Sequence, residues 1–150
     1  MPHRLIAVIG QGTADQHLEQ LARQVGRLLA EGGVSLITGG LGGVMAAASE
    51  GFHQSSQRTG LVIGILPGFR AEDANPHVDI PIATGMGEAR NAIIVSAAEA
   101  FVAIGKGYGT LSEIALALKA GKRVISFESW AMDGVLAVPS AEEAVRMILG

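Results

Sequence analysis

Short apolar runs alternate with amphipathic segments along most of the chain. The runs are rich in valine and isoleucine and are bounded by glycine or polar residues, as expected of strands that are buried on both faces. They cover residues 5–9, 34–37, 61–66, 100–104 and 123–127. The sequence therefore predicts five core strands.

The segments between these runs predict helices. After the first run, apolar residues recur at helical spacing, and a glycine pair closes the segment: Leu18, Leu21, Val25, Leu28 and Leu29, then Gly32 and Gly33. Further helices are predicted at 43–54, 89–98, 110–120 and 140–149. Strands that alternate with helices indicate βαβ units. We expect an α/β fold, a Rossmann-like parallel sheet with helices on both faces. The 150 residues suffice for one core, so residues 1–150 form a single Rossmann-like ligand-binding domain.

Glycine clusters where predicted strands end. The chain has 21 glycines, about twice the usual share of ~7%. The run 100–104 leads through Gly105, Gly107 and Gly109 into a helix that Thr110 opens. Without Cβ atoms, this turn is predicted to take positive φ angles and to let a ligand approach closely. The helix N-terminus adds partial positive charge, which favours a bound phosphate.

A second glycine-rich turn follows the run 34–37, with the sequence Thr38-Gly39-Gly40-Leu41-Gly42-Gly43. In a parallel sheet both turns lie at the carboxyl edge, where ligands bind. Gly10 and Gly12 follow the first strand at the same edge. The irregular stretch 67–88 is either a wall of this site or a solvated connection.

Two common phosphate motifs are excluded. A Walker loop needs Gly-Lys-Ser/Thr at the start of its helix, but Lys106 precedes Gly107. A dinucleotide fingerprint needs a third glycine in the first turn and an acidic residue after the second strand. The chain has Asp15 and Thr38 at the matching places, so NAD is disfavoured.

Charge and composition narrow the partners. The net charge is −3, and the eleven lysines and arginines form no run, so we expect no nucleic-acid partner. There is no cysteine, and His3, His17, His53 and His77 show no ligand spacing, so we expect no protein-ligated metal. The chain shows neither a membrane-length apolar segment nor a signal peptide. These features predict a cytoplasmic protein without membrane association.

The two glycine turns, together with an arginine between them, resemble a known superfamily. Residues 38–45, Arg90 and residues 107–113 are similar to the LOG-like, or lysine-decarboxylase-like, Rossmann superfamily. It includes cytokinin-activating nucleoside-monophosphate phosphoribohydrolases and molybdenum cofactor carrier proteins. The short chain looks closer to the carrier branch. The resemblance implies a site that binds the cofactor, built from Gly10, Gly12, Thr38, Gly39, Gly40, Gly42, Gly43, Arg90, Lys106, Gly107, Tyr108, Gly109, Thr110 and Glu113.

Departures from the phosphoribohydrolase motif favour a carrier over an enzyme. Ser112 stands where that branch has its first glutamate, and Asn91 where it has a lysine. We therefore predict a carrier of the molybdenum cofactor (molybdopterin) with no catalytic residues and with molybdoenzymes as acceptors. The alternative is a nucleoside 5'-monophosphate phosphoribohydrolase that uses Arg90 and Glu113. A third possibility is a nucleotide-sensing module without chemistry.

Several of these residues also have structural interpretations. Thr110 and Glu113 have the spacing of a capping box. Arg90 lies near the start of a predicted helix, where either a bound anion or a salt bridge to Glu88 would explain a cation. Lys106 is either a phosphate contact or a solvated lysine. Tyr108 and Phe69 either flank a planar ring or pack the loops, and Trp130 is interpreted as a core or interface residue.

The segment 91–100 is apolar on almost every side. A helix with so little polar surface needs cover beyond one sheet. The sequence therefore predicts a homo-oligomer, a dimer or a tetramer, that associates through the helix containing Ile93 and Ile94.

Overall fold

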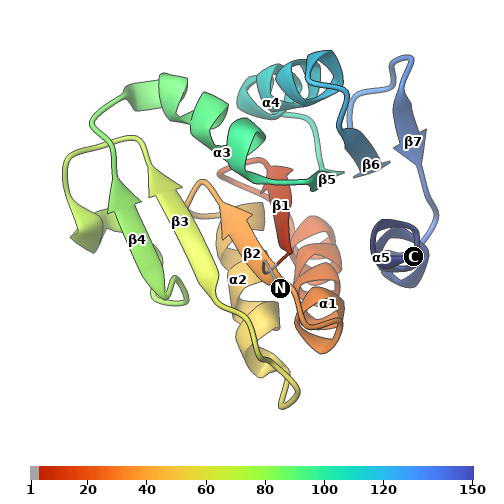
Figure 1. Cartoon of the computed structure of the whole chain (residues 1–150), viewed down its shortest axis with the longest axis horizontal. Coiled ribbons are helices and arrows are strands. Elements are labelled where there is room, and N and C mark those ends of the chain that lie inside the picture. The colour runs from red at the N-terminus through yellow and green to blue at the C-terminus, as the bar shows by residue number, and fades with distance from the viewer. Residues whose placement is uncertain (1–3) are drawn as a thin grey trace.

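The apolar runs form the centre of one parallel sheet in the computed structural model, which describes residues 4–150 (Figure 1). The strands are β1 (Leu5–Gly10), β2 (Ser35–Thr38), β3 (Val62–Leu66), β4 (Ile80–Ala83), β5 (Ala100–Ile104), β6 (Arg123–Phe127) and β7 (Val135–Ala137). Their order is β4-β3-β2-β1-β5-β6-β7, and every neighbouring pair is parallel. The predicted α/β Rossmann-like fold is confirmed.

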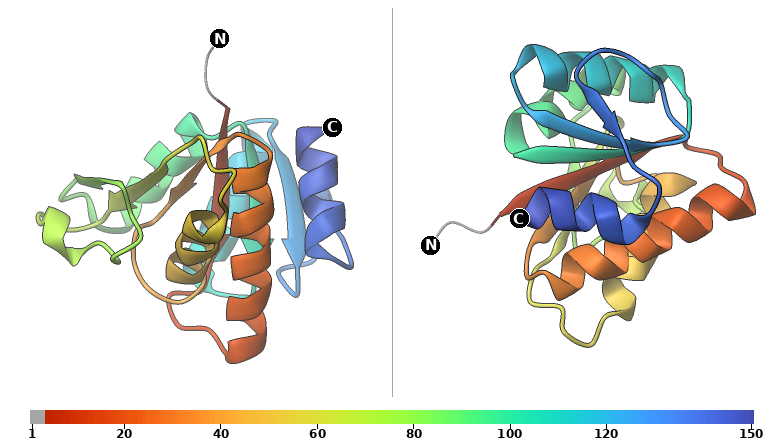
Figure 2. Two further views of the ribbon diagram at one scale, coloured as in Figure 1. Left: turned by 90° about the horizontal axis from the view of Figure 1, so that it is seen from below. Right: turned by 90° about the vertical axis from the view of Figure 1, so that its right-hand side faces the viewer.

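Helices cover both faces of the sheet (Figures 1 and 2). One core contains residues of α1 (Gln16–Glu31), α2 (Val44–Gln54) and α5 (Ala141–Leu149). The other contains residues of α3 (Asn91–Ala97) and α4 (Tyr108–Lys119). Two short 3-10 helices, η1 (Ala71–Asp73) and η2 (Gly87–Arg90), lie in the connection that leads from β3 to α3.

Side-chain caps fix two helix starts. Asp15 caps α1, because its carboxylate accepts a hydrogen bond from the backbone N–H of Leu18 at 2.9 Å. Ser140 caps α5 by accepting from the N–H of Glu143 at 3.1 Å. The glycine pair ends α1 as predicted, with Gly32 as its C-cap and Gly33 at a φ of +80°.

Helices α1 and α2 touch through two glycines. A Cβ atom at Gly26 would overlap the carbonyl oxygen of Ala48, and one at Gly51 would overlap that of Arg23. The two backbones are therefore in direct contact. This contact fixes α2 against α1, and the glycine-rich turn of residues 39–43 leads into α2.

The oligomer interface predicted on α3 needs correction. Ile94 is fully buried within the subunit and packs in the core with Val95 and Ala98. The exposed positions of this helix are Ala92, Ser96 and Ala97. Most of its apolar surplus therefore serves the subunit's own core, and Ile94 is not an interface residue. Self-association itself stays a prediction.

The strand order reverses at β1. The chain steps outward from β1 through β2 and β3 to β4, then returns to the other side of β1 to build β5, β6 and β7. Such a reversal opens a crevice at the carboxyl ends of the two strands that flank it.

Among residues 4–150 no helix combines the length and the apolar character that crossing a membrane requires.

Candidate ligand-binding site

A cleft of about 200 Å³ lies at this carboxyl edge, where β1, β2 and β5 end. It is bordered by the turn after β1, the β2–α2 turn, the segment around η2, and the first turn of α4. Of the residues predicted for the site, those that line it are Gly10, Gly12, Gly39, Arg90, Gly107, Gly109, Thr110 and Glu113. Segments far apart in sequence thus meet at one cavity.

The other predicted residues lie outside the lining, and several support it. The Thr38 hydroxyl is buried and accepts from the N–H of Gly40 at 3.0 Å, so it shapes the turn. Gly43 has a φ of +61° and is the N-cap of α2. Gly40 and Gly42 belong to the same turn but lie outside the cleft wall. The Lys106 side chain is exposed.

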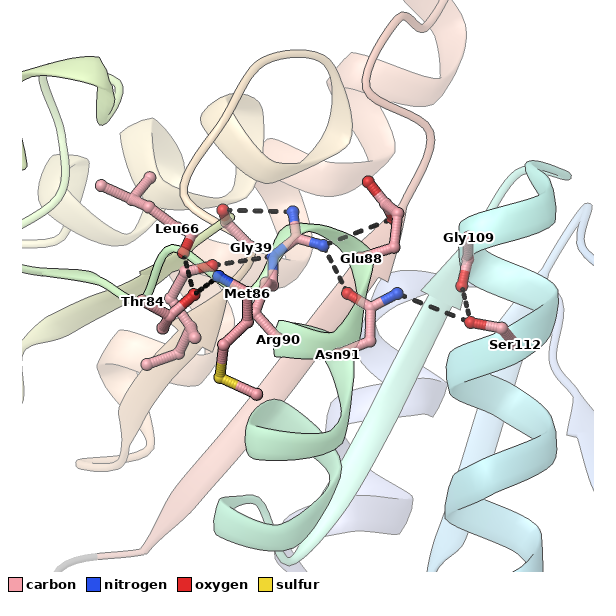
Figure 3. A network of polar contacts seen from close by, with 10 residues as sticks. Gly39, Leu66, Thr84, Met86, Glu88, Arg90, Asn91, Gly109 and Ser112 are labelled. Carbon is pink, nitrogen blue, oxygen red and sulfur yellow. Dashed lines mark hydrogen bonds and ion pairs between the residues drawn. The ribbon is translucent and has the colours of Figure 1, made fainter. Parts of the chain in front are cut away.

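Arg90 is a buried cation at the side of the cleft, only 5% exposed. Its Nε donates to the carbonyl oxygen of Ile65 at 2.8 Å, and its Nη1 donates to the Asn91 side chain (Figure 3). The carboxylate of Glu88 lies 3.7 Å from Nη1 but is largely exposed to solvent. Burial and these hydrogen bonds hold the guanidinium group in place beside the cleft.

The turn between β5 and α4 differs from the prediction. Helix α4 begins at Tyr108 with Gly107 as N-cap, two residues before Thr110, so the prediction that Thr110 opens the helix is wrong, and the alternative interpretation of Thr110 and Glu113 as a capping box does not hold. Positive φ occurs at Gly105, at +81°, but not at Gly107 or Gly109. Gly109 lies in the first turn of α4 and lines the cleft, and because it has no side chain, the approach to the helix N-terminus stays open.

Thr110 is buried inside the first turn of α4, with 2% of its surface exposed. Its hydroxyl oxygen finds no hydrogen-bond partner among residues 4–150. A buried hydroxyl without a hydrogen-bond partner costs free energy. Thr110 also lines the cleft, beside the free backbone N–H groups at the start of α4. The Thr110 hydroxyl and the N-terminus of α4 are therefore suited to an anionic oxygen.

Glu113 lies one turn further along α4 and is also buried. Burial raises the pKa of its carboxyl to about 8; Arg90 opposes the shift and Glu88 adds to it. Glu113 is thus mainly protonated at neutral pH. Since Glu113 carries little negative charge there, the positive charge of Arg90 stays available to an anion in the cleft.

Sequence reasoning missed some of the lining. Gln11 and Met45 line the cleft, together with Ile9, Leu41, Glu88 and Asn91. The side-chain carbonyl of Gln11 accepts from the N–H of Lys106 at 2.8 Å, and its backbone carbonyl accepts from the N–H of Val44 at 3.0 Å. Gln11 therefore joins the turns after β1, β2 and β5. Its place directly after the first strand was the available signal.

The connection between β3 and β4 supports the second glycine turn. The Asn75 side-chain amide donates to the carbonyl oxygens of Gly40 at 3.2 Å and Leu41 at 3.0 Å. Its backbone N–H also donates to Gly40 O at 2.9 Å. Because these hydrogen bonds hold the two carbonyl groups, Asn75 sets the orientation of the peptide groups in the turn.

The two departures from the phosphoribohydrolase motif lie next to each other. The Asn91 amide donates to the Ser112 hydroxyl at 3.5 Å, and that hydroxyl donates to Gly109 O at 3.0 Å (Figure 3). A neutral pair thus occupies the places where the motif has a lysine and a glutamate. The two departures from the motif are therefore in direct contact with each other.

Metal-ligating side chains are not gathered at the site. Among residues 4–150 there is no group of three or more histidine, cysteine, aspartate or glutamate side chains arranged to hold a metal ion. His3, one of the histidines considered above, lies outside the described residues.

The chain belongs to the SLOG cluster4 family, whose model matches residues 3–148. This confirms the resemblance to the LOG-like superfamily. Among similar sequences, an uncharacterised protein from Archaeoglobus fulgidus is 49% identical over 143 residues, which cover 94% of this chain and 91% of that protein.

Solved structures with the same fold include molybdenum cofactor proteins. The molybdenum cofactor binding protein from the phototrophic bacterium Rippkaea orientalis has a TM-score of 0.91 and 38% identity, covering 99% of this chain and 96% of that one. The molybdenum cofactor carrier protein from Chlamydomonas reinhardtii has a TM-score of 0.84 and 31% identity, covering 98% and 96%.

An enzyme is a more distant relative. The cytokinin riboside 5'-monophosphate phosphoribohydrolase LOG from Oryza sativa subsp. japonica is 33% identical over 100 residues. The match covers 64% of this chain and 40% of the enzyme. Similarity in sequence and fold thus connects the chain both to carriers and, more weakly, to a hydrolase.

Proposed function

We propose that this protein binds the molybdenum cofactor and carries it as cargo, with molybdoenzymes as its acceptors. The observation that carries the proposal is the anion receptor in the cleft. Buried Arg90 and the unpartnered Thr110 hydroxyl lie beside the N-terminus of α4, while Glu113 is protonated. These groups fit the terminal phosphate of the cofactor. The similarity to molybdenum cofactor carrier proteins supports this choice of ligand.

In this proposal the chain's residues do no covalent chemistry. The amide groups at the start of α4 and in the β2–α2 turn hold the phosphate, and Arg90 supplies the compensating charge. The raised pKa of Glu113 turns its carboxyl into a hydrogen-bond donor near neutral pH. It donates to an acceptor atom of the ligand, and the cleft releases the cargo intact.

Native mass spectrometry of freshly purified protein tests the proposal. From a host that makes the cofactor, a fraction of the protein should carry the additional mass of molybdopterin. The Thr110→Val variant, which keeps the side-chain volume but lacks the hydroxyl, should carry less. A protein that neither retains the cofactor nor takes it up when supplied would contradict the proposal.

A second candidate is a nucleoside 5'-monophosphate phosphoribohydrolase. It is favoured by one observation: Arg90 and Glu113 line the same cleft, and Glu113 holds a proton that a general acid needs. The neutral Asn91 and Ser112 pair argues against it, because loss of a general acid or base typically costs about 100- to 10,000-fold in rate. Incubation with adenosine monophosphate should therefore release no adenine above background. Steady release that disappears in both Arg90→Ala and Glu113→Ala would establish the enzyme instead.

A further inference from the structure

The single tyrosine and the single tryptophan of the chain stack on each other beside the start of α4. The ring centroids of Tyr108 and Trp130 are 6.0 Å apart, and the ring planes differ by 25°. Tyr108 is nevertheless 84% exposed. One face of its ring lies on Trp130, so the other face is open to solvent.

The pair is held in a fixed relation to the anion receptor. Tyr108 is the first residue of α4, and its two neighbours, Gly107 and Gly109, both line the cleft. The indole N–H of Trp130 donates to the carbonyl oxygen of Gly107 at 2.9 Å. Because this bond anchors Trp130 to the same turn that starts α4, the ring planes are oriented before any ligand arrives.

An exposed aromatic ring of this kind is poorly explained by the needs of the fold. Tyr108 belongs to neither hydrophobic core, and an aromatic ring that stays in water gains little of the free energy that burial would supply. Phe69, which is 88% exposed, differs because its ring packs over Gly85, in the segment that follows β4. Tyr108 combines an open ring face with direct chain continuity to the receptor, since Gly107 and Gly109 on either side of it line the cleft.

We propose that the open face of Tyr108 is a stacking subsite for the planar heterocycle of a ligand whose phosphate binds at the N-terminus of α4. The ligand class is a pterin or purine that carries a phosphate. Trp130 backs the tyrosine ring and keeps it rigid. The inference rests on the proposed function in that both need a phosphate at α4, and it adds where the ring lies.

Two soluble probes with the same charged group separate the ring from the phosphate. Guanosine 5'-monophosphate carries a planar ring, and ribose 5-phosphate does not. When alanine replaces an aromatic side chain on which a base stacks, the affinity for the base falls by about five- to 150-fold. Tyr108→Ala should therefore lower the affinity for guanosine 5'-monophosphate by about tenfold or more and leave the affinity for ribose 5-phosphate unchanged. Tyr108→Phe should bind both like the unmodified protein.

Fluorescence of Trp130 supplies a readout specific to the subsite, because it is the chain's single tryptophan. Guanosine 5'-monophosphate should change this emission in the unmodified protein, and ribose 5-phosphate should change it little. Phe69→Ala is the matched control, an equally exposed aromatic at the same edge of the sheet, and should leave both affinities unchanged.

The outcomes distinguish this inference from the proposed function. Equal affinity of Tyr108→Ala and the unmodified protein for guanosine 5'-monophosphate, or equal losses for both probes, would overturn the subsite. If the protein also retained molybdopterin in that case, the carrier function would stand without it. Ring-dependent binding by Tyr108 in a protein that takes up no molybdopterin would support the subsite and overturn the carrier function.

Discussion

Thr110 places a polar oxygen in the interior of the subunit, and none of residues 4–150 provides it with a hydrogen bond. Such a group costs about 1 to 3 kcal/mol of stability. Thr110→Val removes the hydroxyl at nearly constant volume, so the free energy of unfolding should stay the same or rise. Affinity for phosphate-bearing ligands should fall. Chemical denaturation and titration calorimetry on one protein preparation measure both effects. If the variant binds as tightly as the unmodified protein, the Thr110 hydroxyl does not contact the ligand.

Glu113 makes stability depend on pH. Its folded-state pKa of about 8 lies above the ordinary value of 4.5, so the folded chain keeps a proton that the unfolded chain releases in this interval. Its contribution to the free energy of unfolding is fully present below pH 4.5 and is lost as pH rises toward 8. A shift of this size is worth several kcal/mol at about 1.4 kcal/mol per pKa unit.

Glu113→Gln tests this dependence because the amide is close in shape and cannot ionise. Melting temperatures should fall between pH 6 and pH 9 in the unmodified protein and fall much less in the variant. The two proteins differ only at residue 113, so the difference between the two curves isolates Glu113. Parallel curves would mean that Glu113 is already ionised at pH 6.

The β3–β4 connection supports the β2–α2 turn through Asn75. Asn75→Asp keeps the side-chain oxygen that accepts from the N–H of His77 at 3.0 Å, but it loses the donor to Gly40 O and Leu41 O. A lost hydrogen bond costs about 0.5 to 1.5 kcal/mol. Ligand affinity should therefore fall severalfold, although Asn75 does not line the cleft.

Gln57→Ala, at an exposed position outside the cleft lining, serves as the control for Asn75→Asp. Calorimetric titration of both variants with guanosine 5'-monophosphate is the measurement. An Asn75→Asp protein that binds like the control would show that the turn holds its shape without this support.

The central strands and longer helices were predictable because burial on both faces and helical spacing leave strong signals in the sequence. The edge strands were not. β4 contains Pro81 and is largely exposed, and β7 has three residues, so neither shows a core strand's apolar run. The start of α4 was also misplaced, because a glycine N-cap leaves no side-chain signal and Thr110 imitates one.

The cleft as a whole was predictable in its location and partly in its members. Glycine turns that follow parallel strands must lie at the same carboxyl edge of the sheet, so the glycines and Arg90 were accessible to sequence reasoning. The contacts of Arg90 with Ile65 and Asn91, and the protonation of Glu113, were not. They depend on burial among segments that are distant in sequence, which spacing alone does not encode.

The contact between α1 and α2 leads to a prediction for the molecule as a whole. Gly26→Ala would force α2 away from α1, since a Cβ atom there overlaps the backbone of Ala48. The variant should melt at a lower temperature and also bind ligand more weakly, because the glycine-rich turn moves with α2. The control is Ala22→Gly, which opens space at a buried position of the same helix: it should lose stability with little loss of affinity.

The same glycine contact has a consequence for how this domain tolerates mutation. A random variant library selected for ligand binding would lose substitutions at Gly26 and Gly51 as strongly as at the cleft itself, although neither glycine lines it. Selection for folding alone would accept partial rescue by compensating changes in α2. Selection for ligand binding would therefore retain glycine at both positions, because a side chain there would overlap the backbone of the other helix.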